Sequence, residues 1–95
     1  MYYNANTVLY LNGKFVKAED AATDLFSQTL HYGYGAFEGI RAYQTVNGVK
    51  IFKAHEHFER LIKSCSLLDI PFHHSAEELT QIAYLVLAKN NLKNA

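Results

Sequence analysis

The segment His31–Tyr43 combines the residue types that line small-molecule sites. It holds three of the five glycines and one of the two arginines of the chain, together with three tyrosines and one phenylalanine. Glycine permits backbone angles that other residues avoid, and it lets a ligand approach the main chain. Aromatic rings between such glycines favour a pocket supported by the strand that follows. A tight turn packed by aromatic side chains is the alternative, and the residues alone leave both interpretations open.

Arg60 is the candidate anion-binding residue. At about 100° per residue it lies roughly opposite the apolar positions of its predicted helix. Its guanidinium, one turn before Ser64, could hold a phosphate through two parallel hydrogen bonds, which lysine cannot imitate. The alternative is a solvent-facing arginine paired with Glu56, and the spacing alone favours this second interpretation. A local ion pair between Glu38 and Arg41 is also expected to be structural.

Other kinds of site chemistry find little support in the sequence. His55 and His57 are two residues apart and diverge on a helix, and the histidines at 73–74 have no cysteine or carboxylate at ligand spacing. Cys65 falls among apolar helix positions, where a lone cysteine is usually a core residue. No lysine lies in the apolar surroundings that would make its amine a nucleophile. We therefore expect no metal site and no catalytic residue in this chain.

Composition bounds the class of protein. Ninety-five residues, 49% of them hydrophobic and 14% aromatic, fit one small folded domain. Nine basic and nine acidic residues give zero net charge, and without a basic patch no nucleic-acid partner is expected. No apolar run approaches the ~20 residues of a membrane span, and the first residues lack the features of a signal peptide. With only one cysteine, these features predict a cytoplasmic protein without a membrane partner.

Two β-hairpins are predicted in the first half of the chain. Asn-Gly between apolar β-formers indicates a type I′ turn, in which both central residues have positive φ. This dipeptide occurs at 12–13 and again at 47–48. In the second hairpin apolar residues alternate with Arg41 and Tyr43, so one face should meet a core. The predicted strands are 8–11, 14–16, 40–46 and 49–52.

Two helices are predicted after the hairpins. Apolar residues at helical spacing continue toward Pro71, which ends the first helix at or before Ile70. The second helix begins at Ser75–Glu78, which fits a capping box, and Asn90 or Asn91 is expected to end it. The predicted fold class is therefore α+β, with an antiparallel sheet built from two hairpins packed against two helices.

The motifs Leu30–Gly33, Phe37–Tyr43 and His57–Leu61 occur in this order, followed by Ile70-Pro71. Together they resemble the N-terminal part of the branched-chain amino-acid aminotransferases, which are fold-type IV pyridoxal-phosphate enzymes, and the likeness covers essentially the whole chain. It implies a parent enzyme that transfers the amino group of leucine, isoleucine or valine to 2-oxoglutarate with pyridoxal 5′-phosphate. The alternatives are a D-amino-acid aminotransferase or aminodeoxychorismate lyase of the same fold, a non-enzymatic ligand-binding module, or a dimerisation domain.

The resemblance implies a role for four residues. Arg60 matches the arginine that binds the 5′-phosphate of the cofactor, which reverses the interpretation from spacing. Phe37 and Tyr32 match aromatic walls of the substrate pocket, and the tyrosine can be contributed across a dimer interface in this family. Gly39 matches a pocket glycine that leaves room for substrate. Because the family's Schiff-base lysine lies in a larger C-terminal domain, residues 1–95 should be a single domain, most of the N-terminal small domain of a longer homo-oligomeric enzyme, and inactive alone.

Overall fold

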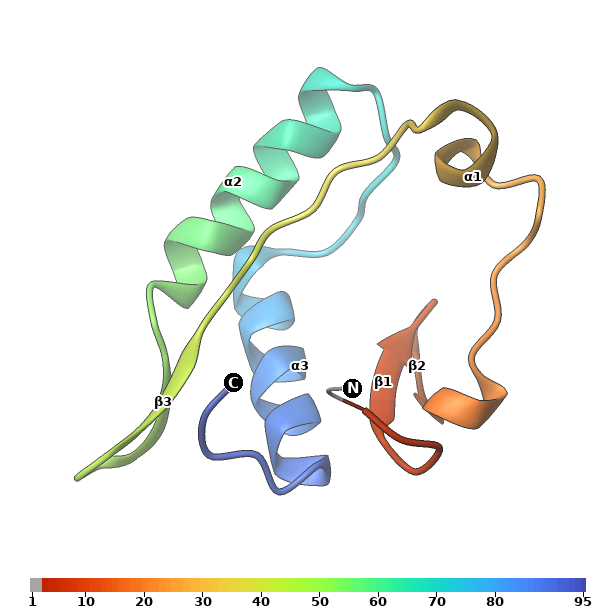
Figure 1. Cartoon of the computed structure of the whole chain (residues 1–95). Helices are drawn as coiled ribbons and strands as arrows, with labels where there is room; N and C mark the ends of the chain where they lie inside the picture. Colours follow the sequence, from red (N-terminus) through yellow and green to blue (C-terminus); the bar gives the residue numbers. More distant parts are fainter. Residues whose placement is uncertain (1–2) are drawn as a thin grey trace.

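The computed structural model describes residues 3–95, which form two β-hairpins and three α-helices (Figure 1). The predicted α+β class is confirmed, and within these residues the hairpins form two separate two-stranded antiparallel sheets. The short helices η1 and α1 were not predicted, because elements of three and five residues show no helical periodicity. In chain order the elements are β1 Val8–Leu11, β2 Lys14–Lys17, the 3₁₀-helix η1 Ala18–Asp20, α1 Gln28–Tyr32, β3 Ala42–Thr45, β4 Gly48–Ile51, α2 Ala54–Leu67 and α3 Ala76–Lys89.

The two Asn-Gly turns differ in backbone geometry. Asn12 and Gly13 have φ values of 51° and 85°, so both adopt the left-handed conformation that a type I′ turn requires. In the second hairpin Gly48 has a φ of 96°, whereas Asn47 does not have a positive φ. The prediction of a second type I′ turn is therefore wrong. Gly48 pairs with Thr45 across the turn, an arrangement typical of a type I turn followed by a glycine bulge.

Both long helices end where the sequence predicts. Asp69 follows α2 with a left-handed φ of 55°, and Asn91 follows α3 with a φ of 52°. In each case the next residue bonds back five positions, so that Ile70 N–H reaches the Cys65 carbonyl at 2.8 Å and Leu92 N–H reaches Leu87 at 3.0 Å. A left-handed residue at this position turns the chain so that the following N–H groups bond to the last carbonyls of the helix, which ends there.

The capping box at the start of α3 is confirmed in its main contact. Ser75 Oγ accepts a hydrogen bond from the backbone N–H of Glu78 at 3.1 Å. The Glu78 carboxylate reaches back to Ser75, where it accepts from the serine hydroxyl at 3.4 Å, and a backbone hydrogen bond from Ser75 helps to lower its pKa. One free N–H of the first turn is thereby satisfied, which fixes the point at which α3 begins.

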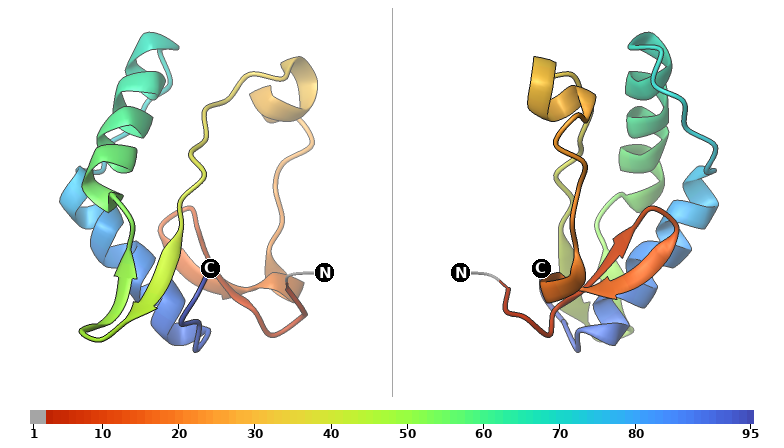
Figure 2. Two further views of the ribbon diagram at one scale, coloured as in Figure 1. Left: turned by 60° about the vertical axis from the view of Figure 1, so that its left-hand side comes forward. Right: turned by 90° about the vertical axis from the view of Figure 1, so that its right-hand side faces the viewer.

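The core lies where the β3–β4 hairpin meets α2 and α3. Ala54, Phe58 and Ala76 are its buried cluster, and Ile40 and Ile51 pack against them. The segment between α1 and β3 runs without regular structure past α2, and the β1–β2 hairpin lies beside α3 (Figures 1 and 2). The radius of gyration of 14.3 Å exceeds the ~12 Å of a compact domain of this length, so the fold is open.

The residues after α3 contact both hairpins. The side chain of Asn90 accepts from the backbone N–H of Val8 at 2.7 Å and donates to the Val8 carbonyl at 2.8 Å. Ala95 and Ala42 exchange two backbone hydrogen bonds, at 2.9 and 3.0 Å. These contacts fix β1 and β3 relative to α3. None of the helices in residues 3–95 combines the length and hydrophobicity of a membrane-spanning segment.

Candidate functional site

Glu38, His57 and Arg60 form a charged cluster on the outer side of α2. Glu38 belongs to the segment that precedes β3, and the other two residues are one turn apart on the helix. Arg60 donates from Nε to Glu38 Oε2 at 2.9 Å and from Nη2 to Oε1 at 2.7 Å. This bidentate geometry is the strongest common arrangement of an arginine and a carboxylate. The cluster therefore joins the segment before β3 to α2 through a well-defined contact.

His57 contacts the same carboxylate. Its Nδ1 lies 2.7 Å from Glu38 Oε1. Because an ionised carboxylate only accepts hydrogen bonds, Nδ1 carries a proton and donates it. The side chain of Glu38 is 7% exposed, whereas that of Arg60 is 65% exposed. The carboxylate is thus enclosed by its donors, and the guanidinium remains open to solvent.

The contacts in the cluster change the ionisation of two of its members. Hydrogen bonds from Arg60 and then from His57 lower the pKa of Glu38 to about 2, against an ordinary value of 4.5. The hydrogen bond to Glu38 raises the pKa of Arg60 further above its already high value. Glu38 is therefore negative and Arg60 positive over the whole physiological pH range.

Arg60 keeps part of its guanidinium available for a ligand. Of the five N–H donors of an arginine, Glu38 takes one on Nε and one on Nη2. Nη2 also lies 3.4 Å from Nδ1 of His57, whereas Nη1 makes no hydrogen bond within residues 3–95, so Nη1 is the nitrogen left open to a ligand. Arg60 also lines a cavity of about 230 Å³ with Lys53, Glu56 and His57. A phosphate group suits Nη1, because an anionic oxygen accepts charge-assisted hydrogen bonds from a guanidinium.

The other residues predicted for the site lie on the surface. Phe37 is 88% exposed and Tyr32 is 76% exposed. A Cβ atom built on Gly39 would meet nothing within 4 Å, so the backbone there is open as well. Phe37 and Gly39 flank Glu38 in sequence, whereas Tyr32 is the last residue of α1. Within the described part of the chain they are not gathered into one enclosed pocket, and their role as substrate contacts stays a prediction.

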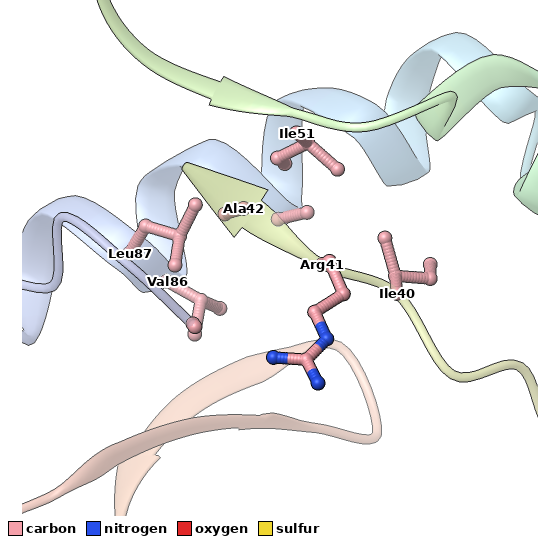
Figure 3. Close-up of a pocket in the computed structure, with 8 residues that line it drawn as sticks. Ile40, Arg41, Ala42, Ile51, Val86 and Leu87 are labelled. Atoms are coloured by element: carbon pink, nitrogen blue, oxygen red, sulfur yellow. The ribbon is translucent and has the colours of Figure 1, made fainter. Parts of the chain in front are cut away.

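A second cavity of about 230 Å³ lies between the β3–β4 hairpin and α3 (Figure 3). Its lining is apolar apart from Arg41, whose guanidinium points away from the labelled apolar side chains (Figure 3). It offers space without a polar group to orient a ligand. The apolar residues labelled around it are Ile40, Ala42, Ile51, Val86 and Leu87.

A third cavity, of about 620 Å³, lies between the α1 region and the end of α2. Cys65 belongs to its lining but is itself only 5% exposed, as expected of a core cysteine. In the region from residue 3 to 95, no three His, Cys, Asp or Glu side chains gather as a metal site would need. The cluster on α2 is therefore the strongest candidate for ligand chemistry.

Glu38 and His57 were not predicted as site residues. The predicted partners were Arg41 for Glu38 and Glu56 for Arg60, and neither ion pair forms among the residues described. Glu38 instead reaches Arg60, 22 positions away. One signal was available, because His57 and Arg60 are three residues apart and share a helix face.

Comparison with known proteins connects this geometry to one family. A model of the family described as Amino-transferase class IV matches residues 35–95. The branched-chain-amino-acid aminotransferase of Pseudomonas aeruginosa is 36% identical over 88 residues, which are 93% of this chain and 29% of that protein. The chain thus spans less than a third of the length of this curated relative.

Solved structures agree with this result. The branched-chain amino acid aminotransferase of Escherichia coli superposes with a TM-score of 0.89 at 38% identity, over 97% of this chain and 30% of that one. The enzyme of the same name from the organism abbreviated T.th., complexed with N-(5′-phosphopyridoxyl)-L-glutamate, gives a TM-score of 0.88 at 37% identity, over 94% of this chain and 30% of its own.

Proposed function

This chain belongs to the amino-transferase class IV family, and we propose that it forms part of a pyridoxal 5′-phosphate-dependent branched-chain amino-acid aminotransferase. Such an enzyme converts leucine, isoleucine or valine and 2-oxoglutarate into the branched 2-oxo acid and glutamate. The observation that carries the proposal is the superposition of 97% of the chain on the Escherichia coli enzyme with a TM-score of 0.89.

We further propose that residues 1–95 are one domain, most of the N-terminal small domain of a longer enzyme. Relatives of this name are more than three times as long as the stretch they share with this chain. The lysine that binds the cofactor covalently would lie in their remaining part. Residues 1–95 alone are then expected to catalyse no amino transfer.

When bound, pyridoxal 5′-phosphate supplies an electron sink for the bond changes at the amino acid's α-carbon, and the protein supplies binding and orientation. Arg60 would hold the phosphate with the donors that Glu38 leaves free. The ion pair with Glu38 does not block this role, because it uses Nε and Nη2 and leaves Nη1 open. A phosphate held in this way orients the whole cofactor relative to the substrate pocket.

Phe37, Tyr32 and Gly39 would shape the substrate pocket. The exposure of both aromatic rings supports this role, since neither ring contributes to the core of the chain. Apolar rings favour an aliphatic side chain over a charged one. Gly39 has no side chain, and no atom lies within 4 Å of where its Cβ would be, so it leaves room for the substrate beside the two rings.

We also propose that the enzyme is a cytoplasmic homo-oligomer, with Tyr32 near the contact between subunits. The exposed apolar side chains around α1 support a contact of this kind, because a monomer rarely leaves such residues clustered in water. They are Leu25, Phe26, Leu30 and Tyr32, all more than half exposed.

The test is an amino-donor screen of the polypeptide encoded by the complete reading frame that contains this chain. With pyridoxal 5′-phosphate and 2-oxoglutarate, it should release glutamate from L-leucine, L-isoleucine and L-valine. Activity with D-alanine but not with leucine would assign it to the D-amino-acid aminotransferases of the same fold and overturn the proposal.

A further inference from the structure

The carboxylate of Glu38 accepts three hydrogen bonds. Oε1 accepts from Arg60 Nη2 and from His57 Nδ1, both at 2.7 Å, and Oε2 accepts from Arg60 Nε at 2.9 Å. The side chain is only 7% exposed, although it lies in a segment without regular structure. Donors on two sides hold the carboxylate in one orientation.

This contact determines which part of Arg60 a ligand meets. A free arginine side chain has many rotamers, and ordering them costs free energy when a ligand binds. Glu38 fixes the guanidinium at two of its nitrogen atoms before any ligand arrives. Binding to a side chain that is already ordered loses less entropy. The contact also keeps the Nε edge occupied, so that only the Nη1 end is presented.

We infer that Glu38 is a positioning residue that orients Arg60 toward the phosphate of the cofactor, with His57 holding the carboxylate in place from the other side. The inference deepens the proposed function and rests on it. Glu38 would influence cofactor binding without contacting the cofactor, because it acts through Arg60.

The sign of the effect separates this role from simple electrostatics. A negative carboxylate close to a phosphate repels it, so removing the charge of Glu38 should strengthen phosphate binding if charge alone matters. If Glu38 acts by orienting Arg60, its removal should weaken phosphate binding instead. A purely structural role would weaken binding of any ligand, whether or not it carries a phosphate.

The experiment compares pyridoxal 5′-phosphate with pyridoxal, which lacks the phosphate. The cofactor-free polypeptide of the complete reading frame is titrated with each compound, and the dissociation constants are measured by absorbance. Glu38→Gln, which keeps the shape of the side chain and removes its charge, should weaken binding of the phosphorylated compound about tenfold, a scale known for residues that orient a ligand-binding group. Its affinity for pyridoxal should change less than about twofold.

Two controls make the result specific. Glu59→Gln makes the same chemical change on α2, at a carboxylate that is 59% exposed and whose one ion pair within residues 3–95 is with His55. It should leave both dissociation constants at their wild-type values. In an Arg60→Ala background, Glu38→Gln should have no further effect, because the residue through which it acts is absent.

Each outcome decides the inference. Equal losses for both compounds in Glu38→Gln, no loss, or tighter binding of the phosphorylated compound would overturn it. If Glu38→Gln does not fold by circular dichroism, Glu38→Asp replaces it, and an unchanged preference for the phosphate would contradict the positioning role. A wild-type protein that binds both compounds equally would refute the phosphate site of the proposed function, and the role of Glu38 with it.

Discussion

Glu38 and Arg60 lie 22 residues apart in sequence and meet in a bidentate ion pair, with Oε1 and Oε2 of the carboxylate accepting from Nη2 and Nε. The pair joins the segment before β3, which holds two of the proposed substrate contacts, to the helix that holds the proposed phosphate contact. Movement of the segment before β3 would therefore displace the Arg60 side chain, and movement of α2 would displace Glu38. This contact explains how a small and open fold can present an ordered anion-binding group.

Substitution of Arg60 should weaken cofactor binding through the phosphate. Loss of charge-assisted hydrogen bonds to an anion is expected to reduce affinity for pyridoxal 5′-phosphate about 10- to 100-fold in Arg60→Ala. Arg60→Lys should recover only part of this, because an ammonium group cannot form the two-point contact with Glu38 and a phosphate together. Equilibrium titration of the complete polypeptide measures both variants.

Lys63→Ala is the matched control for Arg60. Lys63 is an exposed cation of the same helix, so the variant removes the same charge from α2 without touching the cluster. If Lys63→Ala weakened binding as much as Arg60→Ala, the effect would reflect the general charge of α2 and not a specific site.

Glu38 should make the stability of the protein depend on pH. Its native pKa of about 2 lies below the ordinary value of 4.5, so the native state favours the ionised form. The stabilisation is therefore complete above pH 4.5, decreases as the pH falls from 4.5 toward 2, and is absent below that range. The free energies of unfolding of the wild type and Glu38→Gln, measured in urea, should differ at pH 7 and converge only at about pH 2 or below. If the difference in unfolding free energy between the two proteins stayed constant over this pH range, ionisation of Glu38 would not contribute to stability.

Asn90 should be important for attachment of the first hairpin. Its side chain satisfies both the N–H and the carbonyl of Val8 and also donates to the Val86 carbonyl at 2.8 Å. In Asn90→Ala the partly buried Val8 groups lose their partners, which should lower the free energy of unfolding by about 1–3 kcal/mol. Asn94→Ala removes a single exposed contact to Gln44 and should change it by less than about 0.5 kcal/mol. Similar losses in both variants, measured by urea unfolding, would contradict this view.

Gly39→Ala should separate substrate binding from folding. A methyl group at residue 39 would have no atom within 4 Å, and the φ angle of Gly39 is not positive. The free energy of unfolding should therefore change by less than about 1 kcal/mol. In the complete enzyme the KM for leucine should rise, because the methyl group takes space from the proposed pocket. Gly33→Ala is the contrasting variant, since a φ of 64° makes it costly for folding by about 1–2 kcal/mol. An unchanged KM in Gly39→Ala would remove Gly39 from the pocket.

The elements that the sequence predicted correctly depend on local signals. Asn12-Gly13, the end of α2 ahead of Pro71, the Ser75 cap and the stop of α3 at Asn91 each act within five or six residues, where turn and capping chemistry decides the backbone. The second turn, Asn47-Gly48, has the same dipeptide as the first, but its asparagine does not adopt a positive φ. Both turns are compatible with Gly at a positive φ, and a two-residue pattern does not distinguish them.

The parts of the site that were missed depend on tertiary contacts. The pairing of Glu38 with Arg60 spans 22 residues, and that of Asn90 with Val8 spans 82. Local helix spacing offered Arg60 a nearby partner in Glu56, and nothing in the sequence indicated that the segment before β3 would pass along α2. The roles of Arg60 and Phe37 came from resemblance to a family, because an exposed arginine and an exposed ring have no distinctive pattern of their own.

The most direct test is a crystal structure of the complete polypeptide with pyridoxal 5′-phosphate. We predict that Arg60 Nη1 lies about 2.7–3.1 Å from a phosphate oxygen, while Nε and Nη2 keep their contacts with Glu38. A structure in which the Arg60 guanidinium extends into solvent, away from the bound cofactor, would contradict the account.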